Sequence, residues 1–164
     1  MLLVENLFKM NKSDIDHYWY AFLASLPTHS KYFGKTYVAE GFGDNPKLAD
    51  ELGQLIVSGK KTGTCSALWE WEAEANPIPQ PGLISIVLDG IGKPLCIIET
   101  TEVLVCRFNA VDEEFAHAEG EGDLSLEYWR EAHTKFFSRV LPKFGKEFSE
   151  DMPLVCERFK VIYK

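Results

Sequence analysis

The sequence predicts an α+β fold, and three observations support this class. Helical segments with an apolar stripe come first, short apolar runs typical of strands fill the middle, and the last segment alternates apolar with polar residues. The composition, with 46% hydrophobic and 26% charged residues, is that of a globular protein, and 164 residues are enough for one well-buried core. We therefore expect residues 1–164 to form a single domain.

Two amphipathic helices are predicted in the first third of the chain. The first covers residues 13–26, between a capping serine and a proline, and its apolar stripe comprises Ile15, Tyr18, Trp19, Phe22 and Leu26. The second begins near residues 44–46, where a capping residue precedes a proline, and it ends at Gly59. The glycine-containing segment between them is predicted to be a loop.

The rest of the chain is predicted to be mostly strands with inserted helices. A third helical stretch is expected over residues 65–75, before a proline-rich loop at 76–82. Three strands follow at 83–88, 95–100 and 101–108, with a turn at 89–92 between the first two. Helices over 112–118 and 126–141 and a half-buried strand over 154–163 complete the pattern.

The net charge of −8, from 25 acidic and 17 basic residues, restricts the ligands that the protein can attract. Proteins that grip a polynucleotide backbone usually present a basic face. We therefore expect no long-range attraction to RNA and favour a small or partner-delivered ligand, although a local basic cleft can exist within an acidic surface.

Other features predict a cytoplasmic protein without a membrane segment, metal or cofactor. No stretch reaches the roughly 18 consecutive apolar residues of a membrane helix, and residues 1–5 lack the pattern of a secretion signal. The cysteines form no C-x-x-C pair and no histidine lies at zinc-finger spacing, so we interpret Cys65, Cys96, Cys106 and Cys156 as structural. The sequence leaves the oligomeric state open.

Residues 59–64 are the first candidate for chemistry, because they combine Lys60 and Lys61 with Thr62 and Thr64 around Gly63. The order of residues is not that of a P-loop. The two cations could hold a phosphate or polarise a carbonyl. Alternatively, lysines just past a helix end suit the helix dipole, and the threonines cap the next helix.

Residues 119–123 form an acidic loop with carboxylates at Glu119, Glu121 and Asp123. The loop lacks the sixth-position glycine and the twelfth-position glutamate of an EF-hand, so calcium is disfavoured. It is either a solvated acidic loop, or its two glycines shape the backbone so that an acid meets a partner. If that partner is Lys61, the carboxylate and the ammonium would set each other's protonation and orientation.

Trp129 and His133 lie four residues apart on a predicted helix and therefore share one face. A histidine on an apolar stripe is usually a core residue with a satisfied ring nitrogen. The functional alternative is a wall on which a nucleobase stacks.

Taken together, four segments resemble the ASCH family, which is grouped with the PUA-like barrels: residues 58–64, 92–101, 116–123 and 126–133. The resemblance spans about residues 52–163, so residues 1–45 would be an N-terminal helical extension. It implies a PUA-like mixed, mostly antiparallel β-barrel with surrounding helices, and a cleft lined by residues 59–64 and the acidic loop.

Some members of this family resemble amidohydrolases that remove an acyl group from a modified cytidine, using a lysine, a threonine and a glutamate. The matching positions are Lys61, Thr64 and Glu119. Thr64 would supply the nucleophile or position water, Lys61 would act as a base or stabilise an oxyanion, and Glu119 would hold Lys61. Two departures are Ser66, where small members carry arginine, and a helical insert after the motif.

The predicted ligand is therefore a nucleoside, a nucleotide or RNA. We expect further ligand contacts from Lys60, Thr62, Gly63, Glu121, Trp129 and His133. The main alternative is a non-catalytic RNA-binding module, which predicts a basic stripe that joins Lys60 and Lys61 to Arg107 or Arg130. A ribonuclease and a purely structural protein remain further alternatives.

Overall fold

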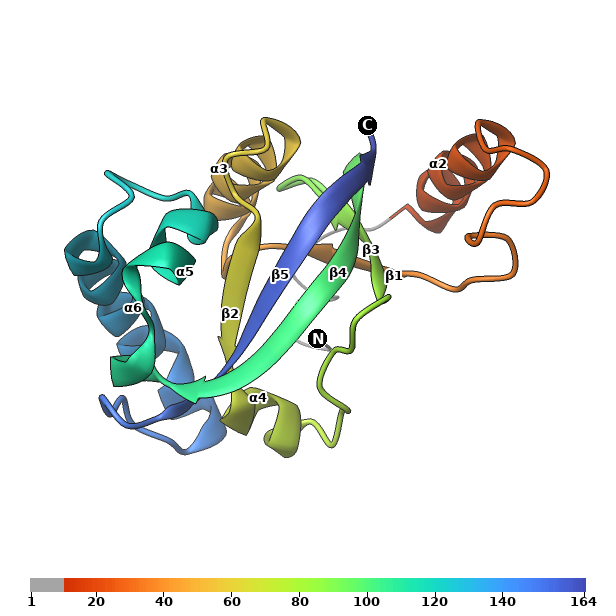
Figure 1. The fold of residues 1–164 in the computed structure, drawn as a ribbon. Coiled ribbons are helices and arrows are strands. Elements are labelled where there is room, and N and C mark those ends of the chain that lie inside the picture. The colour runs from red at the N-terminus through yellow and green to blue at the C-terminus, as the bar shows by residue number, and fades with distance from the viewer. Residues whose placement is uncertain (1–10) are drawn as a thin grey trace. The chain divides into compact units, whose positions relative to one another are not determined.

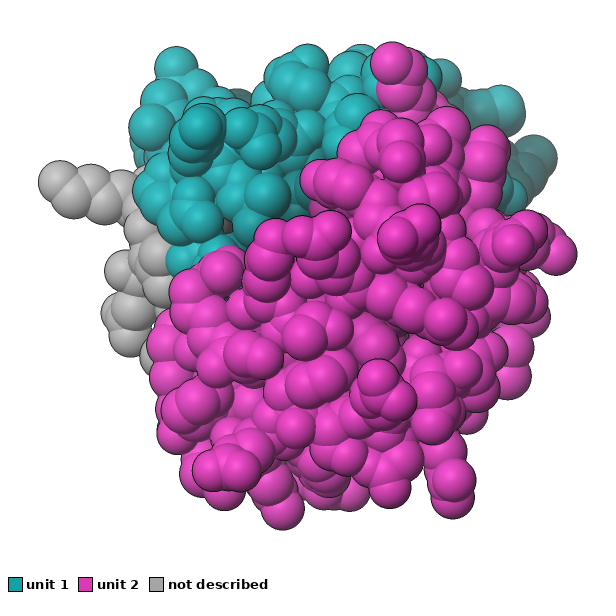
Figure 2. Space-filling view, turned by 90° about the vertical axis from the view of Figure 1, so that its left-hand side faces the viewer, with its two compact units in different colours: residues 1–58, 82–99, 160–164 teal, residues 59–81, 100–159 magenta. Residues whose placement is uncertain are grey.

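A computed structural model describes residues 11–164, whose chain forms two compact units. The first unit comprises residues up to 58 together with 82–99 and 160–164, and the second comprises residues 59–81 and 100–159 (Figure 2). The expectation that the chain lacks a secretion signal concerns residues 1–5, which lie outside the described residues. Among residues 11–164, no helix has the length and apolar content needed to cross a membrane.

The first unit places two helices around one part of a sheet (Figure 1). Its helices are α2 (Lys12–Ala24) and α3 (Pro46–Val57), and its strands are β1 (Val38–Gly41), β3 (Ile84–Leu88) and the first part of β4. The predicted apolar stripe of α2 is confirmed, because Ile15, Trp19 and Phe22 are buried against Ile86 and Ile97 of the strands. Asn45 caps α3 by accepting a hydrogen bond from the backbone N–H of Leu48.

The second unit contains the remaining helices and strands. Its helices are α4 (Leu68–Ala73), α5 (Glu113–Glu119) and α6 (Leu126–Val140), with 3₁₀ turns at Phe108–Ala110 and Leu141–Phe144. Its strands are β2 (Gly63–Ala67), the later part of β4 (Pro94–Arg107) and most of β5 (Pro153–Tyr163). The core packs Phe115 of α5 and Trp129 and Phe137 of α6 against Ala67 of β2 and Leu154 of β5.

The strands form one sheet in the order β1-β3-β4-β5-β2. β1 pairs with β3 in parallel, whereas β3–β4 and β2–β5 are antiparallel, and β4 and β5 run side by side in opposite directions (Figure 1). The predicted α+β class, with a mixed and mostly antiparallel sheet, is therefore confirmed.

Three predictions about individual elements were wrong. Residues 65–67 belong to β2 rather than to a helix, because pairing with β5 overrides the local helical tendency of the glutamate-rich segment that follows. The two strands predicted over 95–108 are one continuous strand, β4. Residues 38–41, predicted as loop, form the short parallel strand β1.

Candidate functional site

The end of helix α5 docks directly on the segment that carries Lys61. The backbone N–H of Thr62 donates to the carbonyl oxygen of Ala118 at 2.7 Å. Gly120, with a left-handed φ of 73°, ends α5, and a Cβ there would lie 2.4 Å from the carbonyl oxygen of Lys60. Glycine is therefore required at residue 120 both for its backbone conformation and for this close approach.

This docking brings Lys61 between two carboxylates of the acidic loop. The Lys61 ammonium donates to Glu119 Oε2 at 2.6 Å and to Glu121 Oε1 at 2.9 Å, and it also reaches the backbone carbonyl of Glu119 at 3.3 Å. The side chains of Lys61 and Glu119 are 1% and 2% exposed, whereas that of Glu121 is 21% exposed. Glu121 is therefore the member of this group that a ligand can reach.

Electrostatic attraction shifts the pKa values of Lys61 and Glu119 in opposite directions. Burial alone would lower the pKa of Lys61, but the charges of Glu119 and Glu121 outweigh burial and raise this pKa above its ordinary value of 10.5. Burial would raise the pKa of Glu119, but the charge of Lys61 is the main cause that holds it well below its ordinary value of 4.5. The raised pKa favours the ammonium form of Lys61, which is the form that can stabilise an oxyanion.

The second oxygen of Glu119 faces helix α6. Trp129 Nε1 donates to Glu119 Oε1 at 3.2 Å, and His133 Nε2 lies 3.5 Å from the same oxygen. Trp129 and His133 do share one helix face, and their rings stack with centroids 4.2 Å apart. Because Trp129 is 2% exposed and also packs against Phe108, its ring faces the protein core rather than solvent.

Thr64 lies on a different face of β2 from this group. Alternation along the strand puts Gly63, Cys65 and Ala67 on one face, and a Cβ at Gly63 would contact Ala118 of α5. Thr64 therefore points away from α5, and its direct partner across the strand pair is Glu157 of β5. Thr100 Oγ1 donates to Glu157 Oε2 at 3.3 Å, so a hydroxyl and a carboxylate gather on this second face. The structure thus brings Lys61, Glu119 and Glu121 together and leaves Thr64 on the other side of the strand.

The remaining predicted ligand contacts divide between surface and interior. Lys60 and Thr62 are exposed and Gly63 is buried. Arg107 and Arg130 are exposed, but the buried Lys61 cannot join them in a basic surface stripe.

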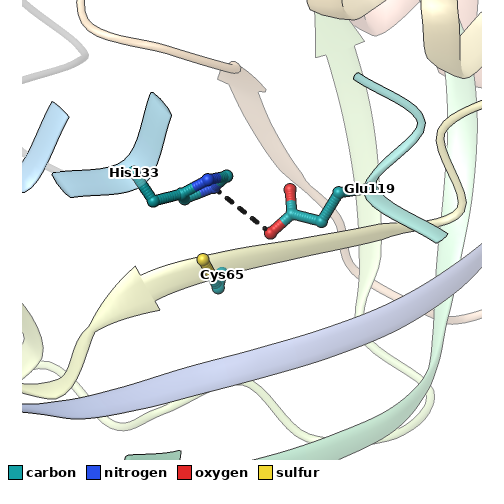
Figure 3. Close-up of side chains that lie close together, drawn as sticks. All are labelled: Cys65, Glu119 and His133. Carbon is teal, nitrogen blue, oxygen red and sulfur yellow. Dashed lines mark ion pairs between the residues drawn. The ribbon is translucent and has the colours of Figure 1, made fainter. Parts of the chain in front are cut away.

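Cys65 is the residue that sequence reasoning missed, because the segment was predicted to be helical. In the strand, its Sγ lies within 4.8 Å of donor atoms of Glu119 and His133 (Figure 3). Burial, reinforced by the charge of Glu119, raises the pKa of the Cys65 thiol well above its ordinary value of 9.0. The signal that could have revealed Cys65 is the odd-numbered spacing Lys61, Gly63, Cys65, Ala67, which a strand places on one face.

Comparisons with known proteins identify the family and support the fold. The ASCH domain family matches residues 38–163, beginning where β1 begins. The crystal structure of an ASCH domain from Lactobacillus crispatus JV V101 is 37% identical, with a TM-score of 0.88 over 96% of this chain and 99% of that one. Protein EF3133 from Enterococcus faecalis V583 is 38% identical, with a TM-score of 0.80 over 92% of this chain and 89% of that one. No curated protein matches the sequence. The extent of the family match and the similarity of two solved structures along nearly their whole length show that the chain belongs to the ASCH domain family.

Proposed function

We propose that the protein binds a nucleoside-sized, RNA-derived ligand at the Glu121 side of the Lys61 group. The ASCH family is PUA-like and associated with RNA binding, which supports this class of ligand. The observation that carries the proposal is the contact of the buried Lys61 ammonium with the carboxylate of Glu121, whose side chain remains 21% exposed. A ligand oxygen that displaces Glu121 from Lys61 would meet a fixed positive charge in a poorly hydrated position.

The finer version of the proposal is hydrolysis of an acylated exocyclic amine, as in N4-acetylcytidine. The ammonium of Lys61 would stabilise the negative charge that develops on the acyl oxygen during attack by water. Glu121, released from Lys61, would take the proton of the attacking water and pass it to the departing amine, giving cytidine and acetate. Glu119 would remain paired with Lys61 and hold the ammonium in place, which is a positioning role.

Two routes of hydrolysis, attack by water and attack by the threonine hydroxyl, differ in the role of Thr64. The family resemblance assigns to Thr64 the nucleophile or the group that positions water, whereas the pleat of β2 points it away from α5. Thr64→Val keeps the shape of the side chain and removes the hydroxyl. Activity that survives this change would favour direct attack by water over attack by the threonine.

The binding proposal is tested by calorimetric titration of the protein with cytidine and with N4-acetylcytidine. We expect binding that tightens about tenfold or more in Glu121→Gln, because the ligand oxygen then displaces a neutral amide from Lys61 instead of breaking a charge-assisted contact, which contributes roughly 1.5–3 kcal/mol. Glu113→Gln, an exposed residue in the first turn of α5, is the matched control and should bind like the wild type. The absence of binding at millimolar nucleoside would overturn the proposal.

The hydrolysis version has a separate readout, which is the release of cytidine from N4-acetylcytidine followed by chromatography. Wild type and Glu113→Gln should turn the substrate over, and Glu121→Gln should lose about a hundredfold or more of the rate, since general acid–base catalysis contributes roughly 10²–10⁴-fold. If the wild type binds the nucleoside but releases cytidine no faster than Glu121→Gln does, the hydrolysis proposal is wrong and only the binding proposal remains.

A further inference from the structure

Three side chains with metal-binding donor atoms meet between β2, α5 and α6. They are Cys65 in the middle of β2, Glu119 at the end of α5 and His133 in the second turn of α6. The Cys65 Sγ, a carboxylate oxygen of Glu119 and a ring nitrogen of His133 all lie within 4.8 Å of one another (Figure 3). Thiolate, carboxylate and imidazole are the ligand types that zinc takes in proteins.

The orientation of the His133 ring is set by its own helix. His133 Nδ1 lies 2.9 Å from the backbone carbonyl oxygen of Trp129, and a carbonyl can only accept, so Nδ1 carries a proton. In the neutral ring Nε2 then has a free lone pair, and it faces Glu119 Oε1. Histidine ligands of metal ions commonly show this arrangement, in which the other ring nitrogen donates to a backbone carbonyl.

The distance from His133 Nε2 to Glu119 Oε1, 3.5 Å, is informative. It is longer than a normal charge-assisted hydrogen bond, which spans about 2.7–2.9 Å. It matches the edge of a zinc coordination tetrahedron, which is about 3.3–3.8 Å for bonds of about 2.0–2.3 Å. Without a proton or a cation between them, a neutral imidazole nitrogen and a carboxylate oxygen would present two acceptors to each other.

From this geometry we propose that Cys65, Glu119 and His133 form a three-ligand site for a divalent transition metal ion, with zinc as the best match. As the ion binds, the Cys65 thiol releases its proton to solvent and the sulfur–metal bond forms. The remaining coordination position is available to water, as in zinc sites with three protein ligands. Glu119 would use Oε1 for the ion while Oε2 stays with the Lys61 ammonium.

The charges around the cluster fit a dication. The two positive charges of the ion, together with the Lys61 ammonium, balance the Cys65 thiolate and the carboxylates of Glu119 and Glu121. Buried charges are tolerated when they are paired or when they coordinate a metal. Trp129 Nε1, which donates to Glu119 Oε1, would orient that ligand from outside the coordination sphere.

Cobalt(II), which substitutes for zinc and absorbs light, tests the site without any substrate. Chelator-treated full-length protein should bind one equivalent of cobalt, with visible bands of a tetrahedral ion and a near-ultraviolet thiolate-to-cobalt charge-transfer band. Cys65→Ser should lose the charge-transfer band, and His133→Gln should weaken binding about tenfold or more. Cys96→Ser, which removes a buried cysteine of the other compact unit, is the matched control and should behave like the wild type.

Two further measurements keep the test decisive. X-ray absorption of the zinc-loaded wild-type protein should show one sulfur among the nitrogen and oxygen neighbours of the zinc. This measurement needs no variant, so it stands even if a variant fails to fold. Circular dichroism of the variants identifies any loss of fold. The site is ruled out if the wild type shows no charge-transfer band, or if the band survives Cys65→Ser and disappears in Cys156→Ser. Since the readout is metal binding, failure of this proposal leaves the proposed nucleoside ligand untouched.

Discussion

Gly120 links the acidic loop to the segment that carries Lys61, and its role can be isolated by comparison with Gly59. Both residues have a left-handed φ, 73° and 77°, but a Cβ at Gly120 would lie 2.4 Å from the Lys60 carbonyl oxygen, whereas nothing lies within 4 Å of one at Gly59. Gly59→Ala should therefore lower the free energy of unfolding only by the cost of a left-handed backbone conformation, about 1–2 kcal/mol. Gly120→Ala should cost about 1–3 kcal/mol more, because backbone atoms must move apart. Urea unfolding of both variants measures the difference, and equal losses would contradict the close approach.

The Lys61 group places a buried ion pair beside the hydrophobic core of the second unit. Lys61 and Glu119 are both almost fully buried, and removing one partner of such a pair typically costs about 3–5 kcal/mol. The residues alone left open whether an acid of this loop meets Lys61, and the family resemblance assigned that pairing to Glu119. The second carboxylate on the same ammonium could not be predicted, because the turn at Gly120 sets the direction of Glu121.

At the scale of elements, amphipathic helices were predictable and the strand pairings were not. The stripe of α2 and the cap of α3 are local features, so the sequence near them contains the necessary information. β2 has no such local signal: its five residues become a strand only because β5, far along the chain, pairs with them from Gly63 opposite Arg158 to Ala67 opposite Leu154. The error over residues 65–67 concealed the face that Cys65 shares with Gly63.

Helix α4 contains a carboxyl group whose titration should be visible in stability. Burial raises the pKa of Glu70 to about 7 from an ordinary value of 4.5. The folded protein therefore holds this proton more tightly than the unfolded chain, and the free energy of unfolding falls as pH rises from about 4.5 to about 7. Glu70→Gln should remove that loss, raising stability at pH above 7 by on the order of 1–3 kcal/mol, with little effect near pH 4.

Thermal unfolding across this pH range tests the behaviour of Glu70. Glu72→Gln is the matched control, because Glu72 is exposed on the same helix. A stabilisation by Glu70→Gln that is the same at acidic and alkaline pH would show that the carboxyl does not titrate in this range.

At the scale of the whole molecule, the net charge is −8, and Lys61 adds no positive charge to the surface because it is buried. Several other cations are already paired: Arg158 lies near Glu102 and Glu114, and both Lys31 and Lys160 contact Glu99. Cations that are held by carboxylates release few counterions when RNA approaches. The charge distribution therefore favours a ligand of nucleoside size over a long strand.

We expect the protein to bind a short single-stranded RNA no more tightly than non-specific binders do at physiological salt, with a Kd of roughly 10⁻⁴–10⁻⁶ M, and with a shallow dependence on salt. Reversing two acids near Arg158, Glu102→Lys with Glu114→Lys, changes the net charge from −8 to −4 because each reversal adds two charges. This double variant should bind RNA more tightly and with a steeper salt dependence than the wild type, as measured by fluorescence anisotropy. Nanomolar binding by the wild type with a steep salt slope would reveal a basic surface that the net charge conceals, and a polynucleotide would then replace the nucleoside as the expected ligand.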